Sequence, residues 1–308
     1  MNITLDHMYY LTGFLLFVFS VYTVFDKNHK TKWGTALFWA IYGVTFVWGK
    51  EIPGYIVGGL VVVMAIIASV KLIGIGSYGE ASKERKNAEA VKYGNKLFIP
   101  TLVVPIITFM IAKFTTLGAL VGLGIGSVAG FVLALFMTKE TLSCASNEGR
   151  RLLDAIGWAA ILSQFLAALG FLFDKAGVGK VVAEMVSSIV PTESMLATVV
   201  AYCVGMALFT MIMGNAFAAF AVITTGIGIP LVIKLHGADP AIAGVIAMLA
   251  GYCGTLMTPM AANFNVVPAA LLEMTDKNGV IKSQIFTALP LLVINIFLMY
   301  YLAFPGVK

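Results

Sequence analysis

Asparagine, threonine, glycine and proline residues interrupt two long apolar stretches in the C-terminal third of the chain. The first, GMALFTMIMGNAFAAFAVITTGIGIPLV, is broken at Gly214 and Asn215, and the second, GYCGTLMTPMAANFNVVPAALLEM, at Thr258 and Pro259. Where a helix is broken inside a membrane, the free N–H groups of a half-helix attract an anion and the free carbonyl groups attract a cation. The two stretches therefore indicate a binding site for a small ion or an anionic molecule.

The candidate ligands all come from these two stretches. Backbone amides and Asn side chains must do most of the binding, because no Lys or Arg lies clearly at mid-membrane depth. The substrate-binding candidates are Gly214, Asn215, Thr255, Thr258, Pro259, Asn263 and Asn265. Hydroxyl groups for a coupling ion, sodium or a proton, come from Thr210, Thr224 and Thr225. No cofactor, resident metal or catalytic residue is expected.

Each break leaves two interpretations open. The first stretch has no polar loop at its join, which favours a re-entrant hairpin over residues 194–233 with its tip buried in protein. Two ordinary spans joined by a tight turn are the alternative. In the second stretch Pro259 lacks a backbone donor and clashes with the preceding turn, so a discontinuous helix is expected over residues 240–274, its second half starting near residues 263–265. A kinked but continuous span is the alternative there.

Membrane helices must position these residues. The chain has 308 residues, of which 60% are hydrophobic and 11% charged, whereas globular domains are about half apolar and a quarter charged. A lipid bilayer requires such an apolar exterior, and it requires backbone hydrogen bonds that close within helices. We therefore predict an all-α polytopic membrane protein with about eight full spans, one re-entrant hairpin and one discontinuous helix.

The positions of the spans and of the basic residues predict the orientation. The first six spans are expected at residues 8–25, 33–48, 55–73, 97–112, 117–137 and 152–173, and the last at 285–304. Up to residue 180, alternate loops contain twelve and four Lys and Arg residues. By the positive-inside rule the N-terminus lies outside and the basic loops are cytoplasmic. The net charge of +5 therefore reflects membrane orientation and not nucleic-acid binding.

Three regions are expected along the chain. Residues 1–150 form scaffold-like helices, residues 151–193 a connecting span and an interfacial helix, and residues 194–308 the region that contains both breaks. The interfacial helix is the segment AGVGKVVAEMVSSIV, whose apolar residues recur at spacings of three and four on a segment too short to span. A simple surface helix is the alternative.

A stripe of glycines runs along the fifth predicted span. These glycines are Gly118, Gly122, Gly126 and Gly130. Because they recur every four residues, they form one smooth face that lets another helix approach closely. The partner helix belongs either to this chain or to another subunit.

The residue types of an enzyme are missing at membrane depth. No His, Asp and Glu cluster lies there, since His7, His29 and His236 fall near span ends. The three cysteines have no CxxC spacing and are interpreted as packing residues. No GxxxxGK[ST] loop is present, which disfavours an ATP-driven pump unless another subunit supplies ATP. We therefore do not expect an enzyme.

Four motifs resemble those of a known family. They are NKLFIP from Asn95, EGRRLLDAIGWAA from Glu148, AYCVGMALFTMIMGNAFAAF from Ala201 and GYCGTLMTPMAANFNVVPAALLEM from Gly251. Over nearly its whole length the chain resembles a bacterial permease family known as domain of unknown function nine-seven-nine. The resemblance implies one subunit of a 5-oxoproline transporter in the bacterial cytoplasmic membrane, alongside a smaller membrane protein.

The order of scaffold spans, interfacial helix, hairpin, broken helix and closing span also resembles one inverted repeat of the elevator-type ion-transporter superfamily. There, two repeats meet and their hairpin tips and broken helices enclose substrate and ions. Only one such set is visible here, so the resemblance implies that a partner subunit supplies the second, in a heteromer or a higher oligomer. The tip is Met213-Gly214-Asn215-Ala216 in place of the Ser-Asn-Thr of the sodium-coupled dicarboxylate branch, which argues against sodium coupling.

These observations lead to two hypotheses from different classes. In the first, the chain is a subunit of a secondary transporter for a small carboxylate, in which the C-terminal half moves against an N-terminal scaffold to give alternating access. In the second, it is a structural or assembly subunit without a substrate site, whose polar breaks pack against a partner.

Overall fold

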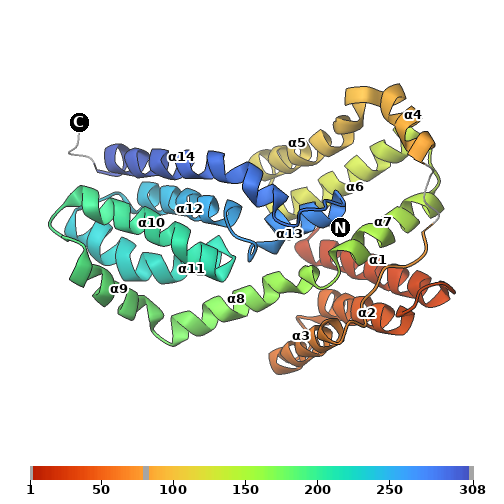
Figure 1. Ribbon diagram of the computed structural model, residues 1–308, viewed down its shortest axis with the longest axis horizontal. Helices are drawn as coiled ribbons and strands as arrows, with labels where there is room; N and C mark the ends of the chain where they lie inside the picture. Colours follow the sequence, from red (N-terminus) through yellow and green to blue (C-terminus); the bar gives the residue numbers. More distant parts are fainter. Residues whose placement is uncertain (1–2, 79–82, 305–308) are drawn as a thin grey trace. The chain divides into compact units, whose positions relative to one another are not determined.

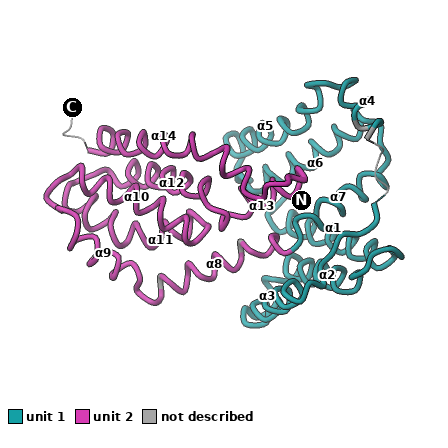
Figure 2. Tube along the Cα trace, viewed as in Figure 1, with its two compact units in different colours: residues 1–157 teal, residues 158–308 magenta. Residues whose placement is uncertain are grey.

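The computed structural model describes residues 3–78 and 83–304, and these residues form helices and connecting loops without any strand. The chain divides into two compact units, residues 1–157 and residues 158–308, which Figure 2 shows in teal and magenta. The boundary falls inside the connecting region 151–193 that the sequence predicts.

Unit 1 is built from packed helix pairs (Figure 1). Its elements are α1 (Leu5–Phe25), α2 (Lys32–Trp48), α3 (Gly54–Ser69), α4 (Lys83–Tyr93), the 3₁₀ helix η1 (Gly94–Phe98), α5 (Ile99–Phe114), α6 (Ala119–Thr138) and α7 (Leu142–Ile156). Helix α1 packs along α2, and α5 packs along α6. Both pairs are antiparallel neighbours in sequence, as short connections require.

Unit 2 surrounds one apolar core. Its elements are α8 (Ala159–Lys175), α9 (Val178–Ile189), α10 (Met195–Met213), α11 (Ala216–Ile223), the π-helix η2 (Thr224–Leu235), α12 (Pro240–Leu256), α13 (Ala262–Leu271) and α14 (Gly279–Leu302). Fully buried Tyr202, Met206 and Met299 mark the core between α10, α12 and α14. An amphipathic α9, as predicted from its spacing, packs on η2.

The structure does not confirm the predicted count of about eight membrane spans. Among the described residues, six helical segments of 19 to 28 residues are long and apolar enough to cross a bilayer, and helices α7 and α8, bent by 63° at their break, add a seventh if together they form one span. The predicted second and third spans are α2 and α3, with 17 and 16 residues. At 1.5 Å per residue they are about 25 Å long, less than the bilayer core of about 30 Å. The six apolar helices still make this a multi-pass membrane protein.

The predicted sixth span, residues 152–173, is wrong as one continuous helix. Helix α7 ends at Ile156, and α8 begins at Ala159 after Gly157, which has a φ of 52°. Glycine adopts this left-handed conformation readily, so it ends a helix without strain. Helix α7 is instead strongly amphipathic and buries Arg150 and Asp154. The sequence pattern missed this because the apolar residues continue across the break.

The two interrupted stretches differ in how they are broken. The first gives two helical arms, residues 195–213 and 216–235, and each is long enough for a complete crossing, which fits the alternative of two spans joined by a turn. The second is a discontinuous helix, as predicted. Helix α12 ends at Leu256, a non-helical segment covers residues 257–261, and α13 begins at Ala262.

Three of the four glycines of the predicted stripe pack inside unit 1, whereas Gly118 lies just before α6 and has no atom within 4 Å of an added Cβ. A Cβ added to Gly122, Gly126 or Gly130 would lie 3.0, 2.7 or 2.8 Å from a backbone carbonyl oxygen of α5. Helix α6 therefore approaches the backbone of α5 as closely as the missing side chains allow. Of the two predicted partners for this stripe, the structure selects a helix of the same chain.

This packing predicts opposite effects for two glycine substitutions. In a helix, Gly→Ala normally stabilises by about 1 kcal/mol, and G58A in α3 should show this gain because no atom lies within 4 Å of its added Cβ. We expect G126A to lower stability instead, by about 1–3 kcal/mol, because its Cβ would overlap the Val104 carbonyl oxygen. Thermal unfolding of both variants in detergent, followed by circular dichroism, tests this. Equal shifts of the two melting temperatures would contradict the close packing.

Candidate functional site

The two interrupted stretches meet inside unit 2. Gly214, which follows α10, lies against Met260 in the break after α12. A Cβ added to Gly214 would lie 2.4 Å from the Met260 carbonyl oxygen, and Gly214 has a φ of 67°. Both the close approach and the left-handed backbone therefore require glycine at this position. We call residues 211–215 and 257–265 together the junction.

Thr258 ties the break to the end of α10. Its hydroxyl group donates to the carbonyl oxygen of Met211 at 2.9 Å and accepts from the amide of Met260 at 3.2 Å. Met211 lies in the last turn of α10, where carbonyl groups lack a partner within the helix. Thr258 is buried, so this hydrogen bond replaces one that water would otherwise supply.

Asn265 holds the two halves of the broken helix together. Its Nδ2 donates to the carbonyl oxygens of Thr255 at 2.8 Å and Thr258 at 2.7 Å. These carbonyl groups lack helical donors because Pro259 has no N–H and the helix stops before it. Asn265 is 1% exposed, and its Oδ1 has no hydrogen-bond partner among the residues that the structure describes. The side chain thus stabilises the break and leaves one buried oxygen available.

The two half-helices start differently. Asn215 caps α11, since its Oδ1 accepts from the amides of Phe217 at 2.9 Å and Ala218 at 3.3 Å. Helix α13 begins at Ala262 without a capping side chain. Asn263 lies in the first turn of α13 and is exposed. The N-terminal end of α13 is therefore the one whose amides have no side-chain cap, although Ala261 and Ala262 are buried there.

The remaining candidates in or beside the junction divide between buried and exposed positions. Thr255 is buried and its hydroxyl group donates to the Tyr252 carbonyl oxygen at 2.6 Å. Thr210 is fully buried, faces Gly251 of α12, and has an Oγ1 without a partner among the described residues. Pro259 is exposed in the break. Thr210 and Asn265 thus share one feature, an unpartnered buried oxygen.

Thr224 and Thr225 lie at the start of η2 and form bonds away from the junction. The Thr224 hydroxyl group is 2.9 Å from the Tyr202 hydroxyl group. The Thr225 hydroxyl group donates to the carbonyl oxygens of Ala221 at 2.8 Å and Val222 at 3.0 Å. The structure does not bring these two candidates together with the others.

Three aromatic rings lie at the junction, and no local sequence pattern selects them. Phe217 of α11 and Tyr252 of α12 have ring centroids 6.3 Å apart, and Tyr252 and Phe264 of α13 are 6.5 Å apart. Phe217 and Phe264 are exposed. The rings meet edge to face, with interplanar angles of 89° and 63°, and provide an apolar border next to the polar break.

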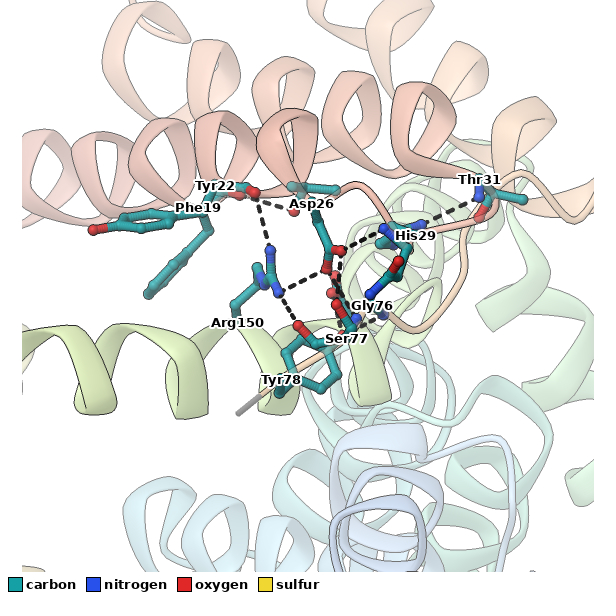
Figure 3. A network of polar contacts seen from close by, with 12 residues as sticks. Phe19, Tyr22, Asp26, His29, Thr31, Gly76, Ser77, Tyr78 and Arg150 are labelled. Atoms are coloured by element: carbon teal, nitrogen blue, oxygen red, sulfur yellow. Dashed lines mark hydrogen bonds and ion pairs between the residues drawn. The ribbon is translucent and has the colours of Figure 1, made fainter. Parts of the chain in front are cut away.

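A second polar centre lies in unit 1 and is absent from the sequence candidates. Asp26, at the end of α1, and Arg150 of α7 form a buried ion pair with an Oδ2–Nη2 distance of 2.9 Å (Figure 3). Arg150 also donates to the carbonyl oxygens of Tyr22 at 3.0 Å and Ser77 at 2.8 Å. A buried ion pair is tolerated only when further hydrogen bonds complete it, as they do here.

Residues 72–78, which we call the strap, lie against this ion pair. Asp26 accepts from the Ser77 amide and hydroxyl groups, both at 2.8 Å, and from the Asn28 amide at 3.0 Å. Burial raises the pKa of Asp26, but these hydrogen bonds and the Arg150 guanidinium outweigh it and bring the pKa below its ordinary value. A Cβ added to Gly76 would lie 2.8 Å from Asp26 Oδ2, so the strap backbone packs directly on the carboxylate.

Asp154 lies one helical turn beyond Arg150 and has different partners. Its Oδ1 accepts from Trp39 Nε1 at 2.9 Å, and its Oδ2 accepts from the hydroxyl group of Tyr78 in the strap. The Tyr78 ring faces the Arg150 guanidinium, with 4.9 Å to the ring centroid. Burial and the bond to Asp154 raise the pKa of Tyr78 above its ordinary value, so the phenol stays a hydrogen-bond donor.

A sequence signal for this network did exist. Arg150 and Asp154 are four residues apart and therefore share one face of a helix. Their partners come from the loop after α1, from α2 and from the strap, which are 73 to 128 residues away along the chain. Only the fold brings these segments together.

Comparisons with known proteins identify a family. A family model described as "Protein of unknown function (DUF979)" matches residues 6–304. Neither the curated proteins nor the solved structures contain a match to the chain.

The junction predicts different results for two asparagines two residues apart. N265A removes two hydrogen bonds to buried carbonyl groups and should lower the free energy of unfolding by about 2–4 kcal/mol. N263A, the matched control, changes an exposed side chain and should change stability by no more than about 0.5 kcal/mol. Melting temperatures in detergent compare the two. If N265A is as stable as N263A, Asn265 does not hold the break.

Proposed function

The chain belongs to the DUF979 family, whose function is unknown, and from its own residues we propose that it is a subunit of a secondary transporter for a small carboxylate. The observation that carries this proposal is the contact of Gly214 with Met260, which brings two interrupted helices together. Each half-helix begins two residues after this contact, α11 at Ala216 and α13 at Ala262. Paired half-helices of this kind bind substrates in membrane transporters.

The chemistry of the junction suits an anion held without a countercharge. Residues 211–215 and 257–265 contain no Asp, Glu, Lys or Arg. A carboxylate would therefore accept hydrogen bonds from the uncapped N-terminus of α13 and from the exposed Asn263 amide. An uncharged site also lets the substrate leave, which a transporter requires.

The aromatic border favours a small cyclic carboxylate. Tyr252 and Phe264 could pack against a five-membered ring while the carboxylate reaches the first turn of α13. A lactam such as that of 5-oxoproline has one N–H donor and one carbonyl acceptor, which an Asn side chain can match. We therefore propose 5-oxoproline as the first substrate to test.

Two buried oxygens supply the coupling-ion part of the proposal. Thr210 Oγ1 and Asn265 Oδ1 have no hydrogen-bond partner among the described residues, although both side chains are buried. Neutral hydroxyl and amide oxygens are suitable ligands for a small hard cation. We therefore propose Thr210 and Asn265 as coupling-ion ligands, and Asn265 takes the place of Thr224 and Thr225.

A partner subunit completes the proposed transporter. One set of paired half-helices encloses a ligand on one side, so we propose that a second membrane protein supplies the opposing set. Unit 2 would then move against unit 1 to give alternating access in the bacterial inner membrane, with the N-terminus outside as the basic loops predict.

The structural or assembly role remains the second candidate, and one observation favours it. The side chains of Asn215, Thr258 and Asn265 already form hydrogen bonds within the chain. Such groups can hold a fold together without binding a substrate. Substitution of Asn263 can distinguish the two functions, because its side chain is exposed and is expected to contribute little to the stability of the fold.

Transport by the complex tests the proposal. Proteoliposomes with the chain and its smaller partner should take up labelled 5-oxoproline under a sodium or proton gradient, and the chain alone should not. N263A should lower uptake about tenfold, the effect of losing one hydrogen bond to a carboxylate, while the complex still assembles. The control is N278A, which changes an exposed asparagine at the start of α14.

No uptake under either gradient would refute this substrate. Loss of the complex in N263A, or uptake equal to that of the unaltered complex, would favour the assembly role.

A further inference from the structure

The buried network of unit 1 has one negative charge in excess. Asp26 and Asp154 supply two carboxylates, and Arg150 supplies one guanidinium, all of them buried. His29 is buried as well, and its Nδ1 accepts from the Thr31 amide at 3.2 Å. Buried charge without compensation is costly, and such a group takes up a proton instead.

The partners of the two carboxylates show where the proton binds. Asp26 accepts four hydrogen bonds, one of them from the Arg150 guanidinium, which favours its ionised form. Asp154 accepts only from the neutral donors Trp39 and Tyr78. We propose that Asp154 is a proton-binding site, and that its occupancy decides whether the strap is held against α1 and α7.

Hydrogen-bond counting links the proton to the strap. The Tyr78 hydroxyl group accepts from the Gly76 amide at 2.8 Å and donates to Asp154 Oδ2. A protonated Asp154 adds one O–H donor but no acceptor. Either this O–H or that of Tyr78 is then left without an acceptor among the described groups. The strap is therefore held less firmly when Asp154 is protonated.

The other ionisable groups around Asp154 limit the interpretation. They are Asp26 and His29 from the segment after α1, Tyr42 next to Trp39 on α2, Tyr78 in the strap and Arg150 on α7. Phenols and guanidinium groups do not titrate between pH 5 and pH 8. Hydrogen bonds and Arg150 hold the pKa of Asp26 below its ordinary value, so His29 is the neighbour that the test must separate from Asp154.

The site is on the side of the protein that the basic loops predict to be cytoplasmic. Residues 26–31, the strap and α7 all come from the loops rich in Lys and Arg. The proton would therefore come from the cytoplasm. This inference does not depend on the proposed transport, because the strap responds without substrate or partner.

Hydrogen exchange of the full chain in lipid nanodiscs tests the proposal. The amides of Gly74, Gly76 and Ser77 are bonded to Thr35, Tyr78 and Asp26. After correction for intrinsic rates, their protection should fall about tenfold between pH 8 and pH 5. D154N, whose amide donates as a protonated acid does, should show low protection at every pH. E148Q, on the same helix but partly exposed, should keep the transition.

Two further variants separate Asp154 from its neighbours. H29Q should keep the transition, and its loss there would assign the proton to His29 and overturn the proposal. Y78F should take up the same number of protons as the unaltered chain between pH 8 and pH 5 in a pH-stat measurement, while protection at Ser77 no longer follows the pH. Protection in the unaltered chain that does not change with pH, or an unchanged transition in D154N, would also overturn the proposal. Because the unaltered chain and Y78F each give a decisive result, the test stands even if D154N does not fold.

Discussion

The cost of leaving a backbone polar group without a partner in an apolar interior shapes both units of this protein. A continuous helix satisfies its own N–H and C=O groups, but a helix that stops inside the apolar core exposes up to four of each. At the junction, side chains form hydrogen bonds with the backbone groups that the helices leave unpaired. Thr258 donates to Met211, Asn265 donates to Thr255 and Thr258, and Asn215 caps α11. These side-chain hydrogen bonds stabilise the break.

The same constraint explains why the unit 1 network contains charges. The strap is non-helical and half-buried, so its amides need acceptors. Asp26 accepts a hydrogen bond from the Ser77 amide, and the Tyr78 hydroxyl group accepts one from the Gly76 amide. A carboxylate in this setting requires a cation, which Arg150 provides. Asp154 forms no ion pair among the residues that the structure describes, and the proposed proton site rests on this difference between the two carboxylates.

Close backbone contact recurs where side chains would interfere. Gly126 and Gly130 bring α6 onto α5, Gly254 brings α12 onto α10 with an added Cβ only 2.3 Å from the Ala207 carbonyl oxygen, and Gly214 brings the hairpin onto the break. In an apolar medium such contacts replace the hydrophobic effect as the source of specificity between helices. Two polar residues of the junction lie next to these glycines in the chain, since Asn215 follows Gly214 directly and Thr258 lies four residues after Gly254.

The sequence by itself determined the helical membrane class, the interruption at Pro259, the amphipathic α9 and the glycine stripe, because each depends on residues close together in the chain. It also selected Thr258 and Asn265, since polar groups in an apolar stretch are conspicuous. Only the tertiary structure decided which of these polar groups are buried, that Gly214 contacts Met260, and that α7 ends at Ile156. The Asp26–Arg150 pair and the Asp154–Tyr78 bond join residues 124 and 76 positions apart. No local pattern encodes such pairs, because the partners are chosen by the packing of whole helices.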